Sequence, residues 1–259
     1  MHLQLTGRTA LITGGSRGIG LAIATTLGRH GCHVRLVARS AEALASAKKQ
    51  VLAAGAPTCE HLALDLSEQG SATTIASAFP GVDLLVNNAG EIPGGSLLDV
   101  PEMQWRRSWD VKVYGYMQLT KAYYPQLARM HGVVINIIGI AGEMLDADYI
   151  AGSVGNAALI AFTKAFGAAS AREGVRMVGI NPGPVLTDRS IKLLQDRAER
   201  RGGTWAGWRE LQAGYPMSRM ASPQEIADAA AFLASPLSAY TSGCVLNIDG
   251  GMSSRHSIA

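Results

Sequence analysis

Short apolar runs alternate along this chain with longer stretches whose apolar residues recur every three or four positions. The short runs predict buried strands at 10–12, 33–38, 61–64, 82–86, 132–138, 175–180 and 245–248. The longer stretches predict helices at 18–30, 42–54, 67–79 with Ser67 as N-cap, 102–130 with a bend near Pro125, and 151–172. Alternating strands and helices predict an α/β fold with a parallel sheet covered on both faces.

The alternation runs without an internal repeat, a low-complexity segment or a linker, so we expect one domain over 1–259. Residues 188–218 interrupt it, because they are polar, basic and broken by Gly202-Gly203. Residues 252–259 read as a short tail.

A glycine-rich turn joins the first predicted strand to the first predicted helix. It reads T-G-x-x-x-G-x-G from Thr13 to Gly20. Such glycines let the backbone turn tightly and approach a ligand, and the free N–H groups of a helix start favour an anion such as a pyrophosphate. Because glycine also serves plain loops, this turn alone leaves nucleotide binding open.

Composition and charge exclude several classes of function. The formal net charge of +3 is too small to argue for nucleic acid. The three cysteines and six histidines show no metal-ligand spacing, which predicts free thiols and no metal site. No apolar run reaches 18 residues and the start MHLQLTGR lacks an apolar signal core, so we expect a cytoplasmic protein without a membrane span.

Several further motifs match one known pattern. Asn87-Asn88-Ala89-Gly90 follows an apolar strand, Pro182-Gly183-x-Val185-x-Thr187 follows another, and P-x-E-I-A and D-G-G stand at 223–227 and 249–251. With the glycine turn they resemble the short-chain dehydrogenase/reductase family over nearly the whole chain. The resemblance implies a Rossmann-type, doubly wound parallel sheet and a small-molecule substrate. It also implies a homotetramer or homodimer that pairs helices 102–130 and 151–172 across a two-fold axis.

The resemblance places a dinucleotide at the carboxyl ends of the strands. The implied cofactor-binding residues are Gly14, Ser16, Arg17, Gly18, Ile19, Gly20, Arg39, Asp65, Leu66, Asn87, Ala89, Gly90, Pro182, Gly183, Val185 and Thr187. An acid at the end of the second strand would bind a ribose 2′-OH and repel a 2′-phosphate. That end carries Ala38-Arg39 instead, and Arg17 adds a second cation, so we expect NADP(H) rather than NAD(H).

The four catalytic positions of the family depart from its pattern. The family uses Asn, Ser, Tyr and Lys, and the matching positions here are Lys112, Gly139, Gly152 and Asn156. Asn and Lys have thus exchanged places. In relatives these two side chains meet through one water, so we expect the Lys112 amine to occupy nearly the same space, delivered from the other helix.

The two glycines at the Ser and Tyr positions leave room for ligand, water or a neighbouring side chain, and we expect a larger pocket. Candidate proton-transfer groups near its mouth are Lys112, Glu91, Glu143, Asp148 and Tyr149. If buried, Lys112 needs a partner: Asn156, the ribose hydroxyls or a carboxylate. Desolvation would lower its pKa toward neutrality.

In the family, the segment 188–218 is the substrate loop. Its basic residues here are Arg189, Lys192, Arg197, Arg200, Arg201 and Arg209. Trp205 and Trp208 could cover a ligand, and the substrate could be anionic. The alternative interpretation is a solvated helix pair with two packing tryptophans.

Three hypotheses about function follow from the differences at the four catalytic positions. The first is an NADP-dependent oxidoreductase acting on a small carbonyl or alcohol, in which substituted groups or water handle the proton. The second is a lyase or isomerase that uses Lys112 and a carboxylate. The third is a nucleotide-binding protein without catalysis. The sequence alone leaves the three open, because function belongs to the site.

Overall fold

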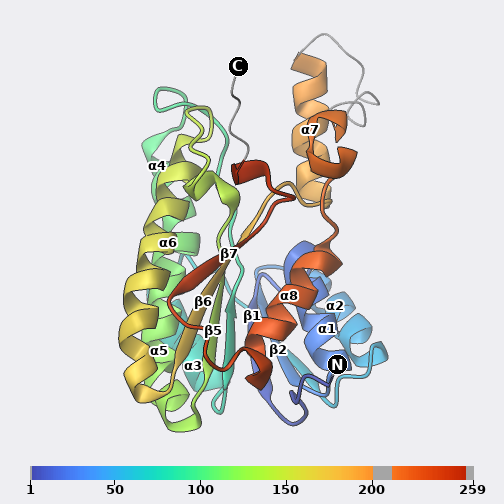
Figure 1. The fold of residues 1–259 in the computed structure, drawn as a ribbon, viewed down its shortest axis with the longest axis vertical. Coiled ribbons are helices and arrows are strands. Elements are labelled where there is room, and N and C mark those ends of the chain that lie inside the picture. The colour runs from blue at the N-terminus through green and yellow to red at the C-terminus, as the bar shows by residue number, and fades with distance from the viewer. Residues whose placement is uncertain (1, 201–211, 255–259) are drawn as a thin grey trace.

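A computed structural model describes residues 2–200 and 212–254 of the chain, and it contains one seven-stranded parallel sheet (Figure 1). The order across the sheet is β3-β2-β1-β4-β5-β6-β7. The strands are β1 Thr9–Thr13, β2 His33–Ala38, β3 Cys59–Ala63, β4 Leu84–Asn87, β5 Val133–Ile137, β6 Arg176–Pro182 and β7 Cys244–Ile248. The predicted single-domain, doubly wound α/β fold is therefore confirmed.

The strand order reverses at β1, which pairs on one side with β2 and on the other with β4. Thr9–Thr13 is in register with His33–Val37, and Ala10–Ile12 with Leu84–Val86. Loops after β1 and β4 leave toward opposite faces of the sheet at such a point, so a crevice opens at the carboxyl ends of the strands.

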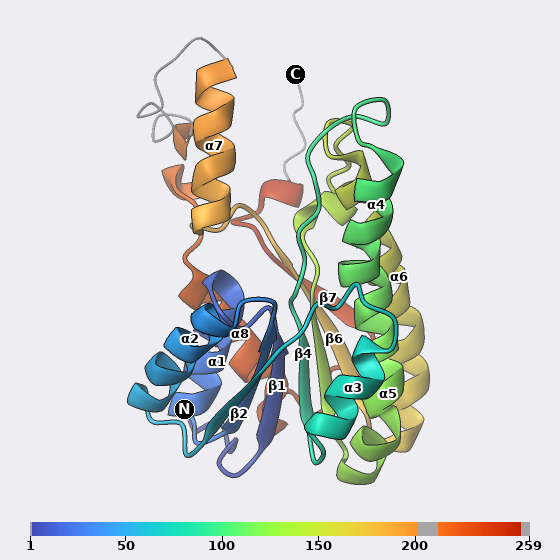
Figure 2. The same cartoon turned by 180° about the vertical axis from the view of Figure 1, so that it is seen from behind.

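Helices cover both faces of the sheet (Figure 2). On one face lie α1 Gly18–Arg29, α2 Ala41–Ala53 and α8 Pro223–Ala234; on the other lie α3 Ser71–Ala78, α4 Glu102–Trp109, α5 Gly115–Met130 and α6 Ile150–Ser170. Each layer encloses an apolar core, centred on residues such as Ile12 and Leu36 on the first face and Leu11 and Leu85 on the second. Alternate residues of one strand thus pack on opposite faces.

The long helix predicted over 102–130 is interrupted by a π-helical segment at Asp110–Tyr114, between α4 and α5. The irregularity falls there and not near Pro125, which lies inside α5. Single π-helical turns of this kind occur often at functional sites, because the extra residue re-aims the side chains that follow it. The segment contains Lys112.

The prediction that Ser67 caps the third helix is wrong. That helix begins at Ser71, with Gly70 as its N-cap at φ +82°. The backbone N–H and the hydroxyl of Ser67 both donate to Asp65 Oδ1, at 2.9 and 2.8 Å. Residues Asp65–Ser67 therefore form a hydrogen-bonded turn of their own, and the helix begins only after it.

Helix α7, Asp188–Arg200, stands beyond the carboxyl ends of the strands (Figures 1 and 2). The predicted tail begins with a 3₁₀ turn at Met252–Ser254. Trp205, Trp208, Arg201 and Arg209 lie outside the described residues. Within the described ranges no helix is both long and apolar enough to span a bilayer, no cluster of metal-ligating side chains occurs, and the three cysteines are free.

Candidate active site

The glycine turn after β1 is folded tightly against the end of β4. Gly14 and Gly18 have φ of +64° and +55°, which an L side chain rarely adopts. A Cβ on Gly20 would lie 2.3 Å from the Gly14 oxygen. The Asn88 amide donates to the carbonyls of Thr13 and Gly14 at 2.9 and 3.2 Å. These contacts explain why the motif needs glycine at these positions.

The start of α1 suits an anionic group. Arg17 is the N-cap residue, its side chain makes no capping hydrogen bond, and the first turn holds no acid. Uncapped N–H groups at a helix start bind phosphate through hydrogen bonds and the helix dipole. Ser16 and Ile19 flank this turn, and the Thr187 methyl lies 3.4 Å from where a Gly18 Cβ would be. The residues present therefore fit a pyrophosphate.

The other residues predicted to bind the cofactor stand at or shortly after the carboxyl ends of the strands. Asn87, Ala89 and Gly90 follow β4, while Pro182, Gly183, Val185 and Thr187 follow or end β6. Leu66 is buried, and Asp65 beside it accepts from Arg107 Nη2 at 3.1 Å. Although partial burial acts in the opposite direction, the hydrogen bonds from Ser67 and Arg107 hold the pKa of Asp65 below its ordinary value.

Arg39, predicted to bind a 2′-phosphate, is paired with another predicted residue. Its Nη2 atom lies 2.7 Å from Glu91 Oε2, and both side chains are exposed. Arg39 follows β2 and Glu91 follows β4, so the ion pair spans the end of β1 that lies between them. A phosphate at Arg39 would compete with the Glu91 carboxylate.

Lys112 and Asn156 meet in the interior. Lys112 Nζ donates to Asn156 Oδ1 at 2.8 Å and to the backbone oxygen of Ile138. The lysine is only 8% exposed, and its alkyl chain packs on Gly90, where a Cβ would lie 2.9 Å from Lys112 Cδ. The side chains of Lys112 and Asn156 are therefore in direct contact, as expected for two residues predicted to have exchanged places.

The Lys112 amine is electrostatically unusual. Burial is the main cause that lowers its pKa from 10.5 to about 7, and the positive charge of Arg189 acts in the same direction. Two acceptors hold the amine, but no carboxylate among the described residues lies within ion-pair distance of it. The group can therefore give or take a proton near neutral pH.

Gly139, at the family's Ser position, adopts φ +131° directly after β5. A Cβ there would lie 3.1 Å from the Asn156 amide nitrogen. Its own N–H donates to Asn181 Oδ1 at 3.4 Å. The local backbone has therefore taken a conformation that suits glycine, and a serine side chain would not fit it without strain.

Glu143 lies on the β6–β7 side of the crevice. Its two carboxylate oxygens accept from Asn181 Nδ2 at 3.2 Å and Asn247 Nδ2 at 2.6 Å. Asn181 Nδ2 also donates to Asn247 Oδ1 at 3.0 Å. Because Asn181 also accepts from Gly139, it connects this exposed carboxylate to the end of β5. The sequence analysis missed both asparagines, which stand at the ends of predicted strands without a motif of their own.

Tyr149 lies over Gly152, the family's Tyr position. A Cβ built on Gly152 would lie 1.9 Å from Tyr149 Cε1 and 2.2 Å from its Cζ. The aromatic ring of one residue thus occupies the space in which a side chain on the other would begin. By contrast, Asp148 is exposed in the preceding turn.

Arg189 joins the loop after β4 to α7. Its Nη1 and Nη2 atoms donate to the carbonyls of Gly90 and Ile92 at 3.1 and 2.6 Å. Its positive charge also offsets part of the increase that burial causes in the pKa of Tyr149. In the sequence, Arg189 stands two residues after Thr187 and could be identified only as one of several basic residues of the substrate loop.

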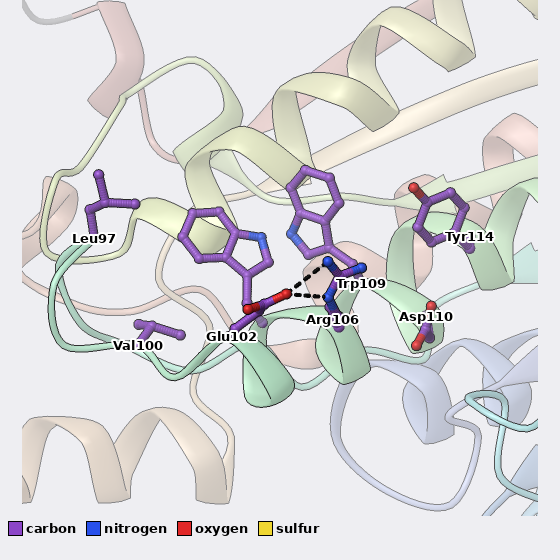
Figure 3. Close-up of a pocket in the computed structure, with 8 residues that line it drawn as sticks. Leu97, Val100, Glu102, Arg106, Trp109, Asp110 and Tyr114 are labelled. Atoms are coloured by element: carbon purple, nitrogen blue, oxygen red, sulfur yellow. Dashed lines mark hydrogen bonds and ion pairs between the residues drawn. The ribbon is translucent and has the colours of Figure 1, made fainter.

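A separate hollow of about 490 Å³ lies on the outer side of α4 (Figure 3). It is lined by Leu97, Val100, Glu102, Trp105, Arg106, Trp109, Asp110 and Tyr114. The Lys112 amine and Gly139 are absent from its lining, so we distinguish this hollow from the crevice at the strand ends.

Known proteins resemble this chain over nearly its whole length. A family model described as enoyl-(acyl carrier protein) reductase matches residues 14–253. The chain is 34% identical to a 2-keto-3-deoxy-L-fuconate dehydrogenase of Xanthomonas campestris, over 97% of the chain and 82% of the relative. It is also 34% identical to the 3-oxoacyl-[acyl-carrier-protein] reductase of Vibrio cholerae, over 96% of the chain and 99% of the relative.

Solved structures share the whole fold. The L-sorbose reductase of Gluconobacter frateurii, solved with NADPH and L-sorbose, matches with a TM-score of 0.90 and 29% identity. The match covers 99% of this chain and all of that one.

Proposed function

The chain belongs to the short-chain dehydrogenase/reductase family, and from this premise we propose that it is an NADP(H)-dependent oxidoreductase of hydroxylated carbonyl compounds. In this proposal Lys112, Gly139, Gly152 and Asn156 occupy the catalytic positions in place of the usual side chains. The observation that carries it is the buried Lys112 amine, held by Ile138 and Asn156.

The choice of cofactor rests on the crevice. The glycine turn and the uncapped start of α1 fit a pyrophosphate. Arg39 and Arg17 supply positive charge for a 2′-phosphate, and Ala38 stands where an acid would favour NAD. Relatives solved with NADPH or NADP support the same choice.

When bound, the nicotinamide supplies or accepts the hydride. The side chains of this protein then have to orient the reacting carbonyl and move one proton. Lys112, with a pKa of about 7, can exchange a proton near neutrality without the large cost of a permanently charged buried group. Asn156 fixes the direction of the amine.

The proposed substrate class is a ketose, a deoxy-keto sugar acid or the corresponding alcohol. Two compared relatives carry names of this class, the keto-deoxyfuconate dehydrogenase and the sorbose reductase. The exposed Glu143 carboxylate, positioned by Asn181 and Asn247, can accept hydrogen bonds from sugar hydroxyls.

The test combines cofactor titration with a substrate panel. NADPH and NADH are titrated by calorimetry, and NADPH oxidation is followed with L-sorbose, a 2-keto-3-deoxy sugar acid and an acetoacetyl thioester. We expect tighter NADPH binding and turnover of a sugar substrate. Glu143→Gln should raise KM for that sugar, whereas the surface control Glu60→Gln should not.

The two alternative hypotheses predict different results in the same test. NADPH binding with no turnover of any carbonyl would favour a non-catalytic nucleotide-binding protein. Product formation with no net change in NADPH would favour a lyase or isomerase.

A further inference from the structure

We propose that Tyr149 supplies the phenolic hydroxyl that the family's Tyr position lacks, delivered from the preceding turn into the space over Gly152. This inference rests on the proposed oxidoreductase function, because it assigns a proton to a carbonyl reduction. It goes beyond that function by naming the group that carries the proton, and by explaining the glycine at position 152.

The first argument is steric. A Cβ on Gly152 would lie 1.9 Å from Tyr149 Cε1, and real Cβ atoms essentially never approach another heavy atom so closely. The Tyr149 ring and any side chain at position 152 therefore exclude each other. The Tyr149 ring can take this position only because residue 152 is a glycine.

The second argument is that the turn holding Tyr149 is fixed. Gly152 N–H and Ser153 N–H donate to the Tyr149 carbonyl at 3.0 and 2.9 Å and start α6 there. The Ser153 hydroxyl is hydrogen-bonded to the Asp146 backbone, and Gly95 N–H donates to the Asp148 carbonyl at 2.6 Å. The backbone that carries Tyr149 is therefore held by hydrogen bonds on both sides of the residue.

The third argument is electrostatic. Arg189, from α7, donates to the carbonyls of Gly90 and Ile92, and its charge acts on the phenol of Tyr149. The same charge acts on the Lys112 amine, whose alkyl chain packs on Gly90. Arg189 and Lys112 therefore both lie beside the Asn-Ala-Gly loop, and the Arg189 charge influences the phenol as well as the amine.

The protonation state fits a proton donor. Burial raises the pKa of Tyr149 above its ordinary value, and the charge of Arg189 offsets part of that increase. The phenol therefore stays protonated at neutral pH. In contrast, alcohol oxidation would need the phenolate and should be favoured at alkaline pH.

The proposed step balances as follows. A hydride adds to the carbonyl carbon, Tyr149 Oη gives its proton to the carbonyl oxygen, and the C=O π bond breaks as C–H and O–H bonds form. The carbonyl is reduced and NADPH is oxidised to NADP⁺. The Tyr149 phenolate regains its proton from the Lys112 ammonium or from solvent.

The primary test compares Tyr149→Phe, which keeps the ring over Gly152, with Tyr240→Phe, whose ring is fully exposed. Single-turnover hydride transfer should fall by about 10²–10⁴-fold in the first variant, the usual worth of a general acid, and stay unchanged in the second. NADPH affinity should stay within twofold in both. Wild-type reduction should decline at alkaline pH as the phenol ionises, and Tyr149→Phe should lack that decline.

A transposition test separates chemistry from packing. The double variant Tyr149→Gly with Gly152→Tyr returns a tyrosine to the family's Tyr position and should recover turnover relative to Tyr149→Gly alone. Gly152→Tyr alone should be inactive, because two rings would compete for one space. Failure of the double variant to exceed Tyr149→Gly, with both folded by circular dichroism, would overturn the proposal.

A titration without substrate gives an independent readout. The absorbance difference at 295 nm between wild type and Tyr149→Phe should show a phenol ionising above its ordinary pKa, and Arg189→Met should raise that pKa further. An ordinary, solvated phenol unaffected by Arg189→Met would overturn the inference. If Tyr149→Phe turned over at the wild-type rate, the inference would fail while the oxidoreductase function stood; an inactive wild type would overturn both.

Discussion

Lys112 Nζ lies 2.8 Å from Asn156 Oδ1, so two residues that we predicted from the sequence to have exchanged places in the catalytic pattern meet through their polar ends. One comes from the π-helical segment between α4 and α5, the other from α6. The contact between these two side chains is retained although the residues differ from the family pattern. This is easier to explain if the protein still uses the site than if the site has lost its function. We expect the contact to govern both stability and cofactor-dependent chemistry.

The buried amine should give stability a characteristic pH dependence. The folded-state pKa of Lys112 is about 7 and the ordinary value is 10.5, so between these pH values the unfolded chain binds more protons. Its destabilising effect is therefore complete below pH 7 and disappears as pH rises to 10.5, by up to about 1.4 kcal/mol per pH unit. Lys112→Met should remove this slope.

The measurement is urea unfolding from pH 6 to 10, with the exposed Arg129→Met as control. The control should follow wild type across the range. Parallel curves for wild type and Lys112→Met would show that the amine is solvated in solution.

The ion pair between Arg39 and Glu91 should compete with the cofactor. Glu91→Gln frees the guanidinium, so we expect NADPH affinity to rise about two- to fivefold, as an exposed pair is worth at most about 1 kcal/mol. Arg39→Ala should weaken NADPH binding at least tenfold and leave NADH binding within twofold. Calorimetric titration checks both, with Glu60→Gln as an ion-paired control on β3. Equal losses for both cofactors in Arg39→Ala would argue against a 2′-phosphate site.

Restoring the family's serine at position 139 should harm the protein. Gly139→Ser places a side chain at φ +131° and 3.1 Å from the Asn156 amide, which should cost about 1–3 kcal/mol of stability. Gly214→Ser, at a position with open space, is the matched control and should be near neutral. Thermal unfolding distinguishes the two variants. If Gly139→Ser were as stable as wild type and turned over faster, the backbone at position 139 would not require glycine.

A homodimer or homotetramer remains our prediction for the assembly. The outer surface of α4 and α6 exposes apolar side chains, including Met103 at 84% and Val154 at 43%, beside the hollow lined by Trp105 and Trp109. Val154→Lys should weaken association, whereas Leu52→Lys on α2 should not. Light scattering at micromolar concentration is the measurement, and a monomeric wild type would refute the prediction.

The sequence predicted the fold and the place of the crevice well because both follow from local patterns. Apolar runs such as Ala10–Ile12 indicate a strand that is buried on both faces of a sheet. The glycines at 14, 18 and 20 indicate a tight turn in which larger residues do not fit. Helix starts were harder. Ser67 has the right chemistry for a cap, but it donates to Asp65 in a separate turn and the helix begins only at Ser71, which the residue pattern does not reveal.

From the sequence alone we also predicted that Lys112, Gly139, Gly152 and Asn156 stand at the four catalytic positions, because flanking motifs mark those places in the chain. Only the tertiary structure decided what surrounds them: the ring of Tyr149 over Gly152, and Glu91 paired with Arg39. The physical reason is that periodicity reports which face of an element is buried, whereas the direction of a side chain in a turn depends on backbone dihedrals and on the atoms that reach it from other elements.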